Sequence, residues 1–525
     1  MQNGKCKVQN ADFKGMKQQS ALLVAIDIGT SSVRTHLMDG EGVIWRTAAR
    51  PVQVALSSDG RAEVDPQQIW VDVCLLLREI LEGVPPKKIE AVGLASALGY
   101  IFIDMEGAPL SPAMLWMDRR AGREAQEISN RINPERLYQI TGRRLDPEIF
   151  LAKLLWFRRH QPQNFKKART FIGIKDYVIS RLTGFIGSDL THATYTMLFD
   201  VTKRNWSDEI LDIFEIPGAI LPKFLKAHEV AGNITGEASM ATGLPAGTPV
   251  VSGASDGTVG SLASGIAESG AAVNVTGTSD VLMTTTSQPL HDPQQRTLLN
   301  PHPVLDLWMV GGVMGTTGGV LKWFAEKFCP ELTRSDRYKI LDKEAEQAGI
   351  GARGLVALTG FSGERAPLWN PLARGVLFGI ELSHGRGEIA RAILEGVAYT
   401  IRNMAKVLKE IGADVRRIRV VGGGAVSDLW NQIRADVTQI PFERAKVTEG
   451  TATGITLLTG LGIGLYKDLG EATRRIAPAE KTYEPKPSNG LIYEKLGQVQ
   501  RSAYEALCQS FKDLEEVRGT LPMGK

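Results

Sequence analysis

Two short stretches with nearly the same pattern constrain this chain more than any other feature. The first is Val24–Arg34, VAIDIGTSSVR, and the second is Val273–Val281, VNVTGTSDV. In both, the apolar and β-branched residues favour a strand, and the glycine permits a tight turn. The backbone N–H groups and hydroxyls of a Gly-Thr-Ser turn suit phosphate oxygens. Either turn alone could be an ordinary hairpin, but the pair predicts a duplicated fold that holds a polyphosphate between two lobes.

The size and charge of the chain exclude several classes of protein. A length of 525 residues predicts two to three domains. The hydrophobic content of 43% and charged content of 23% are typical of globular proteins. The net charge is only +3, and no dense basic run with interleaved aromatics is present, so we expect no nucleic-acid partner. The four cysteines lack paired spacing, which argues against a zinc site or a disulfide framework and indicates a reducing compartment.

The two ends of the chain carry no sign of a membrane or secretory segment. Residues 1–20 are polar, without the apolar core of a signal peptide, and are expected to form a flexible tail. Residues 451–466 look apolar but are rich in Gly and Thr and too few to span a bilayer. We therefore expect a cytoplasmic protein without a membrane partner.

The order of predicted elements favours an α/β protein with a mixed sheet in each lobe. Strand, hairpin, helix and strand follow one another from the first Gly-Thr-Ser turn to the buried strand Ile89–Ser96, and the order recurs in the second half up to the helix Asp428–Thr438. Residues 184–248 look like a long polar connection. The predicted boundary lies near Ser264, which gives an N-terminal lobe of residues 21–264 and a C-terminal lobe of residues 265–525.

Two aspartates could carry phosphoryl-transfer chemistry. Asp27 and Asp256 each follow a predicted strand and face a glycine-rich turn. Phosphoryl transfer from a nucleotide needs one carboxylate near magnesium and another that takes the proton of the attacking hydroxyl. Asp27 suits the first role and Asp256 the second, although either could be a helix N-cap or turn aspartate. Gly422–Gly424, between a strand and a helix, leaves room for a flat ligand or a phosphate, or is a plain tight turn.

Two other glycine motifs are weaker signals. Gly253–Gly257 satisfies G-x-S-x-G with Ser255 as nucleophile, but a hydrolase of that type also needs a downstream acid and histidine and an HGGG-type segment, which does not precede it. Gly349–Gly354 spells G-x-G-x-x-G after a helix and before a strand, the reverse of the dinucleotide-binding order, so a loop is expected. No Walker motif is present.

The most specific motif is Gly375–Gly396, GVLFGIELSHGRGEIARAILEG, which resembles the second signature of the FGGY carbohydrate kinases. FLAKLLWFRRH resembles the first signature in keeping Lys153 and Trp156, but Phe150 stands at its small or proline position. SGERAPLWNPLARG, from Ser362, is similar to xylulokinase-type members. The similarity covers nearly the whole chain from Leu22 to Tyr466. It implies an actin-like ATPase (ribonuclease H-like) fold, with two duplicated lobes and a central cleft.

The resemblance also implies an activity and a set of site residues. The activity is transfer of the γ-phosphate of ATP, with Mg²⁺, to a hydroxyl of a small sugar, a ketopentose such as D-xylulose. Asp256 is implied as the catalytic base in contact with the sugar, and Asp27 as the residue that works with the metal and the phosphates. The implied nucleotide contacts are Asp27, Gly29, Thr30, Ser31, Gly277, Thr278, Ser279, Gly318, Gly423, Gly424 and Asp428, and the implied sugar contacts are Leu98, Trp116 and Asp118.

One departure from the xylulokinase pattern leaves the sugar open. The Gln-Met-His-Gly sugar-contact segment reads Ala97–Tyr100, ALGY, here and lacks the histidine. Gluconate, another ketose, a polyol or an autoinducer-like dihydroxy ketone are therefore alternatives. An actin-like nucleotide or sugar sensor without phosphate transfer is a further alternative, disfavoured by the presence of both Asp27 and Asp256. A homodimer is implied only by resemblance, and the helices after about Lys481 could pack back onto the first lobe.

Overall fold

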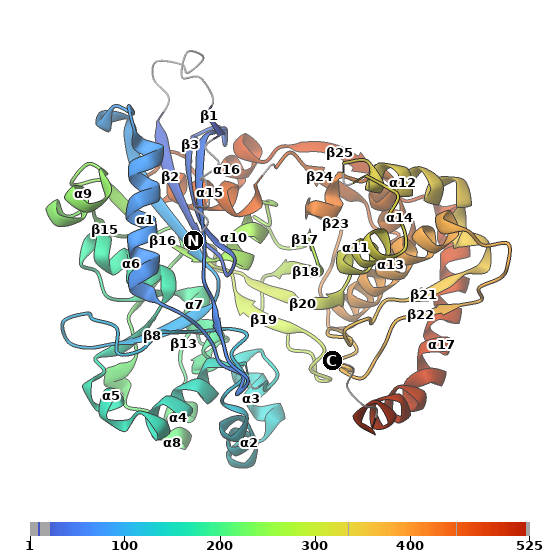
Figure 1. Cartoon of the computed structure of the whole chain (residues 1–525), viewed down its shortest axis with the longest axis horizontal. Coiled ribbons are helices and arrows are strands. Elements are labelled where there is room, and N and C mark those ends of the chain that lie inside the picture. Colours follow the sequence, from blue (N-terminus) through green and yellow to red (C-terminus); the bar gives the residue numbers. More distant parts are fainter. Residues whose placement is uncertain (1–8, 11–20, 147, 334, 448, 521–525) are drawn as a thin grey trace. The chain divides into compact units, whose positions relative to one another are not determined.

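The computed structural model describes residues 9–10, 21–146, 148–333, 335–447 and 449–520, so most of the tail expected at residues 1–20 lies outside the described residues. The chain forms two compact units (Figure 1). Unit 1 comprises Met1–Ala267, Leu299–Trp308 and Val447–Pro478, and unit 2 comprises Glu268–Leu298, Met309–Lys446 and Ala479–Lys525. The first break, after Ala267, is close to the boundary expected at residue 264, but the later segments alternate between the units.

Unit 1 is built on a seven-stranded mixed sheet of order β1-β4-β3-β2-β7-β16-β15. β2 pairs antiparallel with β3 and parallel with β7, and β16 pairs parallel with β7 and antiparallel with β15. The strands are β1 (Gln9–Asn10), β2 (Leu22–Ile28), β3 (Ser32–Asp39), β4 (Ile44–Pro51), β7 (Ile89–Ser96), β15 (Val230–Asn233) and β16 (Pro249–Ser255). Buried apolar runs in β2 and β7 match central strands that are covered on both faces.

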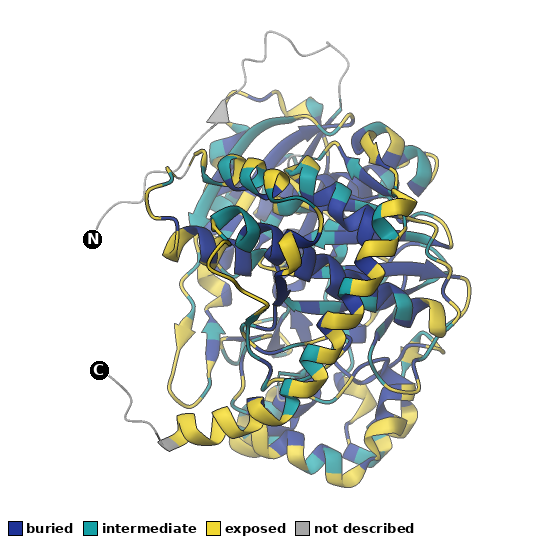
Figure 2. Cartoon of the chain, turned by 90° about the vertical axis from the view of Figure 1, so that its right-hand side faces the viewer, coloured by how far each residue is buried: buried dark blue, intermediate teal, exposed yellow. Residues whose placement is uncertain are grey.

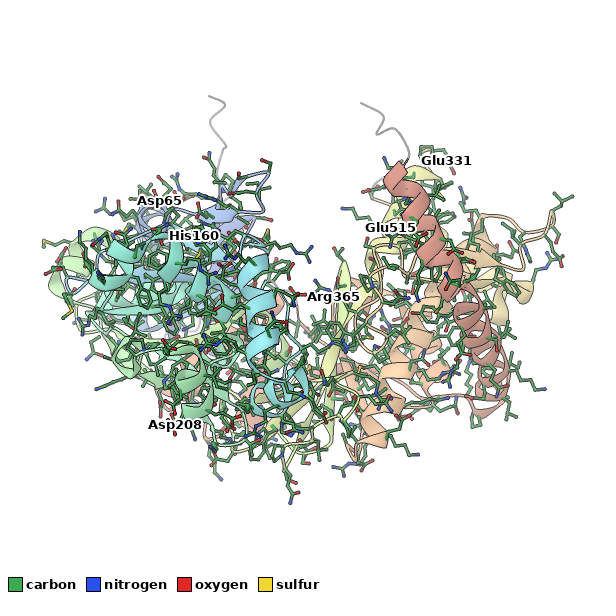
Figure 3. All side chains as sticks on the ribbon, turned by 90° about the horizontal axis from the view of Figure 1, so that it is seen from below. Asp65, His160, Asp208, Glu331, Arg365 and Glu515 are labelled. Atoms are coloured by element: carbon green, nitrogen blue, oxygen red, sulfur yellow. The ribbon has the colours of Figure 1, made fainter. Side chains whose placement is uncertain are left out.

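Helices cover both faces of this sheet (Figure 1). α1 (Pro66–Leu81), capped by Asp65 (labelled in Figure 3), packs on one face with α6 (Ile174–Thr183) and α9 (Gly236–Thr242). α10 (Asp256–Leu262) and α15 (Gly450–Gly462) lie on the other. α15 approaches closely: a Cβ on Gly93 would lie 1.9 Å from Thr459 Oγ1. The Gly- and Thr-rich composition of residues 451–466 therefore serves tight helix packing, which also assigns the segment to unit 1.

A second layer of unit 1 carries a five-stranded sheet of order β10-β8-β9-β6-β5 and several short helices. Aromatic side chains of Phe102, Phe150, Phe157 and Phe171 form its core. Its elements are β5 (Ala55–Leu56), β6 (Ala62–Val64), β8 (Gly99–Ile103), β9 (Ala113–Leu115), α2 (Gly122–Arg131), α3 (Pro134–Thr141), α4 (Phe150–His160), α5 (Pro162–Lys167) and β10 (Thr170–Gly173), while η2 (Pro86–Lys88) connects α1 to β7 of the main sheet.

The prediction of a long polar connection at residues 184–248 is wrong. This region holds β11 (Ser188–Asp189), α7 (Leu190–Tyr195), β12 (Phe199–Asp200), β13 (Asn205–Trp206), α8 (Asp208–Phe214), η3 (Gly218–Ile220), β14 (Phe224–Leu225), β15 and α9. Each element is too short to give a clear period in the sequence.

Unit 2 repeats the plan of unit 1. Its main sheet contains the order β20-β18-β17-β23-β24-β25, which corresponds to β4-β3-β2-β7-β16-β15. The pairing senses agree: β17 is antiparallel to β18 and parallel to β23, β24 is parallel to β23, and β25 is antiparallel to β24. The strands are β17 (Ala271–Thr276), β18 (Ser279–Thr286), β20 (Trp308–Thr316), β23 (Arg417–Gly422), β24 (Phe442–Ala445) and β25 (Ala479–Tyr483); β19 (Leu298–Pro301) spans a unit boundary.

The helices of unit 2 include the last helix of the chain. They are α11 (Gly318–Lys327), α12 (Arg337–Ala348), η4 (Ile350–Gly354), α13 (Arg386–Glu410), η5 (Gly423–Val426), α14 (Asp428–Thr438) and α17 (Pro487–Thr520), with a small hairpin of β21 (Val356–Leu358) and β22 (Val376–Phe378); α16 (Leu469–Ile476) belongs to unit 1. α17 packs on α14 and β21, and its outer face is exposed (Figure 2). Glu515, labelled in Figure 3, pairs with Arg374 at 2.7 Å. α17 thus belongs to unit 2. Among the described helices, none is long and apolar enough to cross a membrane.

Candidate active site

Three parallel strands of unit 1 end at the same edge of the sheet, and this edge brings Asp27 and Asp256 together. β7 lies between β2 and β16, and Ser96 at its end is in register with both Ile28 and Ser255. Asp27 is the penultimate residue of β2, and Asp256 directly follows β16 as the first residue of α10. The two acids therefore stand at the carboxyl ends of strands that are two positions apart, roughly 10 Å across the sheet.

The electrostatics of the two aspartates are coupled. Burial, followed by the charge of Asp256, raises the pKa of Asp27 to about 7, although Arg34 acts in the opposite direction. Burial also raises the pKa of Asp256, against the opposing effects of the Gly257 N–H and of His192. Gly257 N donates to Asp256 Oδ1 at 2.7 Å. Partly buried, mutually repelling carboxyls are suited to accept a proton or to bind a cation.

The turn at the end of β16 explains its glycine and removes the hydrolase alternative. Gly253 has φ +68°, and a Cβ there would lie 1.7 Å from Leu94 O, so the glycine is required by a close strand approach. Ser255 is buried, and its Oγ shares a hydrogen bond with Thr258 Oγ1 at 2.8 Å. This hydroxyl has the environment of a structural serine and not of an exposed nucleophile.

Two of the predicted sugar segments meet just beyond the same edge. Leu98, two residues past β7, accepts a hydrogen bond at its carbonyl from Trp116 N at 2.9 Å. Lys153 on α4 is buried, and its Nζ donates to the carbonyls of Leu115 at 2.6 Å and Trp116 at 3.1 Å. The side chain of Trp116 stays 40% exposed. Lys153, which the sequence marks only as a signature position, thus holds the loop that presents Trp116.

Asp118 differs from its neighbours in the predicted sugar site. It is fully buried, accepts from Ala62 N at 2.8 Å and pairs with Arg120 at 2.6 Å. Arg120 also pairs with Glu63 and lies over the ring of Trp156. The carboxylate of Asp118 is therefore held in a buried ion-pair network that fixes the loop.

The predicted nucleotide segments of unit 2 also meet. The Gly277–Ser279 turn joins β17 to β18, and the carbonyl of Thr278 accepts from Thr317 N at 3.0 Å and Gly319 N at 3.1 Å. A Cβ on Gly318 would lie 2.3 Å from Gly277 O. The hydroxyl of Thr276 accepts from Gly424 N at 2.9 Å. Both glycine-rich turns and the start of α11 therefore lie against one another.

The three glycines of the Gly422–Gly424 turn have different environments. The nearby Asp428 has partners that the sequence did not indicate. Gly422 has φ +95°, a Cβ on Gly423 would meet nothing within 4 Å, and Gly424 faces side chains of unit 2. Asp428 accepts from Arg444 Nη1 at 2.8 Å, Lys481 Nζ at 2.6 Å and the Tyr483 hydroxyl at 2.5 Å. Hydrogen bonds from Lys481 and Tyr483 lower the pKa of Asp428. Its carboxylate is thus occupied by β24 and β25.

Sequence reasoning missed several groups beside the acids. Ser96, between the two acid-bearing strands, is buried, and its hydroxyl has no hydrogen-bond partner among the described residues. Close to the same edge, Asp189 accepts from His192 Nδ1 at 2.6 Å and pairs with Lys175 at 2.8 Å. With Asp176 this cluster has the composition of a metal site, but the buried Lys175 ammonium also pairs with Asp176 and supplies the positive charge. The contacts of this cluster all lie within residues 175–192.

Comparisons with known proteins agree with this geometry. Residues 22–263 match the model of the N-terminal domain, and residues 272–463 that of the C-terminal domain, of the FGGY family of carbohydrate kinases. The chain is 30% identical to the xylulose kinase of Escherichia coli (strain K12), over 93% of this chain and 99% of that protein. The crystal structures of xylulose kinase from Rhodospirillum rubrum (30% identity) and gluconate kinase from Lactobacillus acidophilus (27%) each have a TM-score of 0.86 and cover 94% of this chain and 100% of theirs.

These findings confirm the resemblance and the fold class that the sequence predicts, and they place the chain among enzymes. The chain belongs to the FGGY family of carbohydrate kinases and has the two-lobe actin-like ATPase fold of that family.

Proposed function

We propose that this chain transfers the γ-phosphate of ATP to a hydroxyl of a neutral ketopentose such as D-xylulose. The observation that carries the proposal is the coupled pair of carboxyls, Asp27 and Asp256, at the common edge of β2, β7 and β16. A kinase needs a base for the attacking hydroxyl and a carboxylate that works with the metal of the nucleotide. This edge offers both groups.

Each aspartate has a role that its surroundings support. Asp256 accepts the proton of the sugar hydroxyl as it attacks, because burial raises its pKa and makes its carboxylate more basic. Asp27 holds Mg²⁺: its carboxyl faces the repelling charges of Asp256 and Glu449, an arrangement that a divalent cation relieves. When bound, the ion neutralises charge on the phosphate oxygens.

The nucleotide contacts follow from the two repeated turns. In unit 2, Gly277–Ser279 offers backbone groups that suit phosphate oxygens, with Gly318 and Gly423 beside this turn. In unit 1, the Gly29–Ser31 turn offers the same kind of groups. A Cβ on Gly423 would meet nothing within 4 Å, which leaves room for a ligand beside this turn. Asp428 stays a prediction, since its carboxylate already accepts from three side chains.

The charges around the sugar segments support a neutral substrate over gluconate. A carboxylate substrate needs a cation that is free to pair with it. Beside Trp116, however, Arg119 pairs with Glu148, Arg120 pairs with Asp118 and Glu63, and Lys153 donates to two carbonyls. Similar proteins include both xylulose kinases and a gluconate kinase, so this local charge balance is what favours the ketose.

The test is ADP release with Mg-ATP against a panel of ketopentoses, other ketoses, gluconate, polyols and dihydroxy ketones. We expect a strong response to D-xylulose or another ketopentose and a weak one to gluconate. A response to gluconate alone would overturn the substrate class. A flat panel together with intact ATP binding by calorimetry would favour a nucleotide or sugar sensor instead.

A further inference from the structure

A buried acid stands directly behind the second Gly-Thr-Ser turn. Asp280 is fully buried, and its carboxylate accepts from the Thr317 hydroxyl at 2.7 Å, Asn274 Nδ2 at 3.2 Å and the backbone N–H of Gly277. Thr317 is the residue before α11, and Gly277 begins the turn. One carboxylate thus ties the turn to the start of the helix.

A buried arginine faces this acid from the other glycine-rich turn. Arg434 on α14 is fully buried, and its Nη2 lies 4.0 Å from Asp280 Oδ2. Its Nη1 donates to Gly424 O at 3.3 Å and to Asn431 Oδ1 at 2.8 Å, and the guanidinium lies over the ring of Trp430. Its Nε and Nη2 have no hydrogen-bond partner among the described residues. Burial lowers the pKa of Arg434 to about 10.

The fold itself does not require this pair. In the corresponding hairpin of unit 1, the residue after the Gly-Thr-Ser turn is Ser32, not an acid. Burying an ion pair with incomplete hydrogen bonding is unfavourable compared with apolar packing. The pair is therefore a feature of this unit and not of the shared sheet. It contacts the three segments of unit 2 that the proposed function assigns to the nucleotide: the Gly277 turn, the start of α11 and the Gly422–Gly424 turn.

We propose that Asp280 and Arg434 are positioning residues for the nucleotide, an inference that rests on the proposed function. Asp280 fixes the Gly277 turn against the start of α11, and Arg434 fixes Gly424 against the same acid. The guanidinium also offsets a carboxylate that would otherwise repel the phosphates from behind the turn.

The test compares nucleotide affinity with stability in Asp280→Asn, Arg434→Met and the double variant. We expect each single variant to weaken ADP binding about tenfold or more by calorimetry and to raise the KM for ATP, with the KM for the sugar unchanged. Because both residues act on one network, the double variant should lose less than the product of the two single losses. Thr317→Val, which removes the single hydrogen bond to Asp280, should also weaken ADP binding and raise the KM for ATP, but by a smaller factor.

The control is a second buried pair of unit 2, Arg391 with Glu395 at 2.6 Å, which contacts Gly351 and Tyr493. Glu395→Gln should lower Tm about as much as Asp280→Asn while leaving ADP affinity unchanged. Unchanged ADP affinity in Asp280→Asn, or equal weakening in Glu395→Gln, would overturn the inference. ADP binding needs no sugar, so a wild-type chain that binds ADP but phosphorylates no sugar would refute the proposed function and leave this test in place.

Discussion

The two main sheets share one strand order but place their acids differently. In unit 1, Asp27 precedes the Gly-Thr-Ser turn, and the equivalent position in unit 2 is Val275. In unit 2, Asp280 follows the turn, and the equivalent position in unit 1 is Ser32. Asp27 is partly exposed at the strand edge beside a second acid, whereas Asp280 is fully buried and faces Arg434.

The two units therefore offer different chemical groups to a ligand, although their sheets share one strand order. Unit 1 presents titratable carboxyls at its edge, which suit proton transfer and a cation. Unit 2 presents backbone groups and glycines, while Asp280 beside its turn accepts hydrogen bonds from Thr317 and Asn274 and faces the guanidinium of Arg434. We infer that the chemistry of the proposed kinase depends on unit 1 and the placement of the nucleotide on unit 2.

The largest effect should come from removing the proposed base of unit 1. Asp256→Asn keeps the shape but cannot accept a proton, so we expect kcat to fall by about 10²- to 10⁴-fold with nucleotide affinity retained. ADP release and calorimetry measure the two quantities. Ser255→Ala is the matched control one residue away and should keep near-normal kcat. Near-normal turnover in Asp256→Asn would remove the base from the mechanism.

Asp27, the other acid of unit 1, should lower the stability of the folded chain when it is ionised, in addition to its proposed role in activity. The pKa of Asp27 is about 7 in the folded chain against 3.8 as the ordinary value. Between these values the folded state binds more protons than the unfolded one, so stability falls as pH rises from about 4 to 7. Asp27→Asn replaces the titrating carboxyl with a neutral amide, so the variant should not lose this stability as the pH rises. We expect the free energy of unfolding to rise by about 2 kcal/mol at pH 8 and by less at pH 5, while kcat falls.

Denaturant unfolding at both pH values checks this prediction. Asp118→Asn is the contrasting control, because it breaks the buried pair with Arg120 and should destabilise the chain at either pH. A loss of stability in Asp27→Asn at pH 8 would contradict this prediction, because it would show that the ionised Asp27 carboxylate stabilises the folded chain.

The sequence predicts what local patterns determine, and it fails where partners are distant. Strand Ile89–Ser96, predicted from its composition, and helix Asp428–Thr438 have the bounds that the sequence predicts. The assignment of residues 447–478 to unit 1 follows from the packing of α15 on β2, β7 and α10, including the close approach of Thr459 to Gly93, which no local pattern contains. In the same way, the partners of Asp118 and Asp428 include Ala62 and Lys481, each more than fifty positions away. Burial and pairing of a polar side chain are long-range properties.

The smallest effects should come from two adjacent glycines of unit 2, and they separate packing from ligand contact. A Cβ on Gly424 would lie 3.0–3.1 Å from Trp430, Arg434 and Thr276, whereas one on Gly423 would meet nothing within 4 Å. Gly424→Ala should therefore lower Tm by a few degrees, because buried neighbours must shift. Gly423→Ala should leave Tm unchanged but raise the KM for ATP about tenfold, since its open face is where we place the nucleotide. If Gly423→Ala changed neither quantity, this turn would only connect β23 to α14, and unit 2 would have to hold the nucleotide through the Gly277 turn alone.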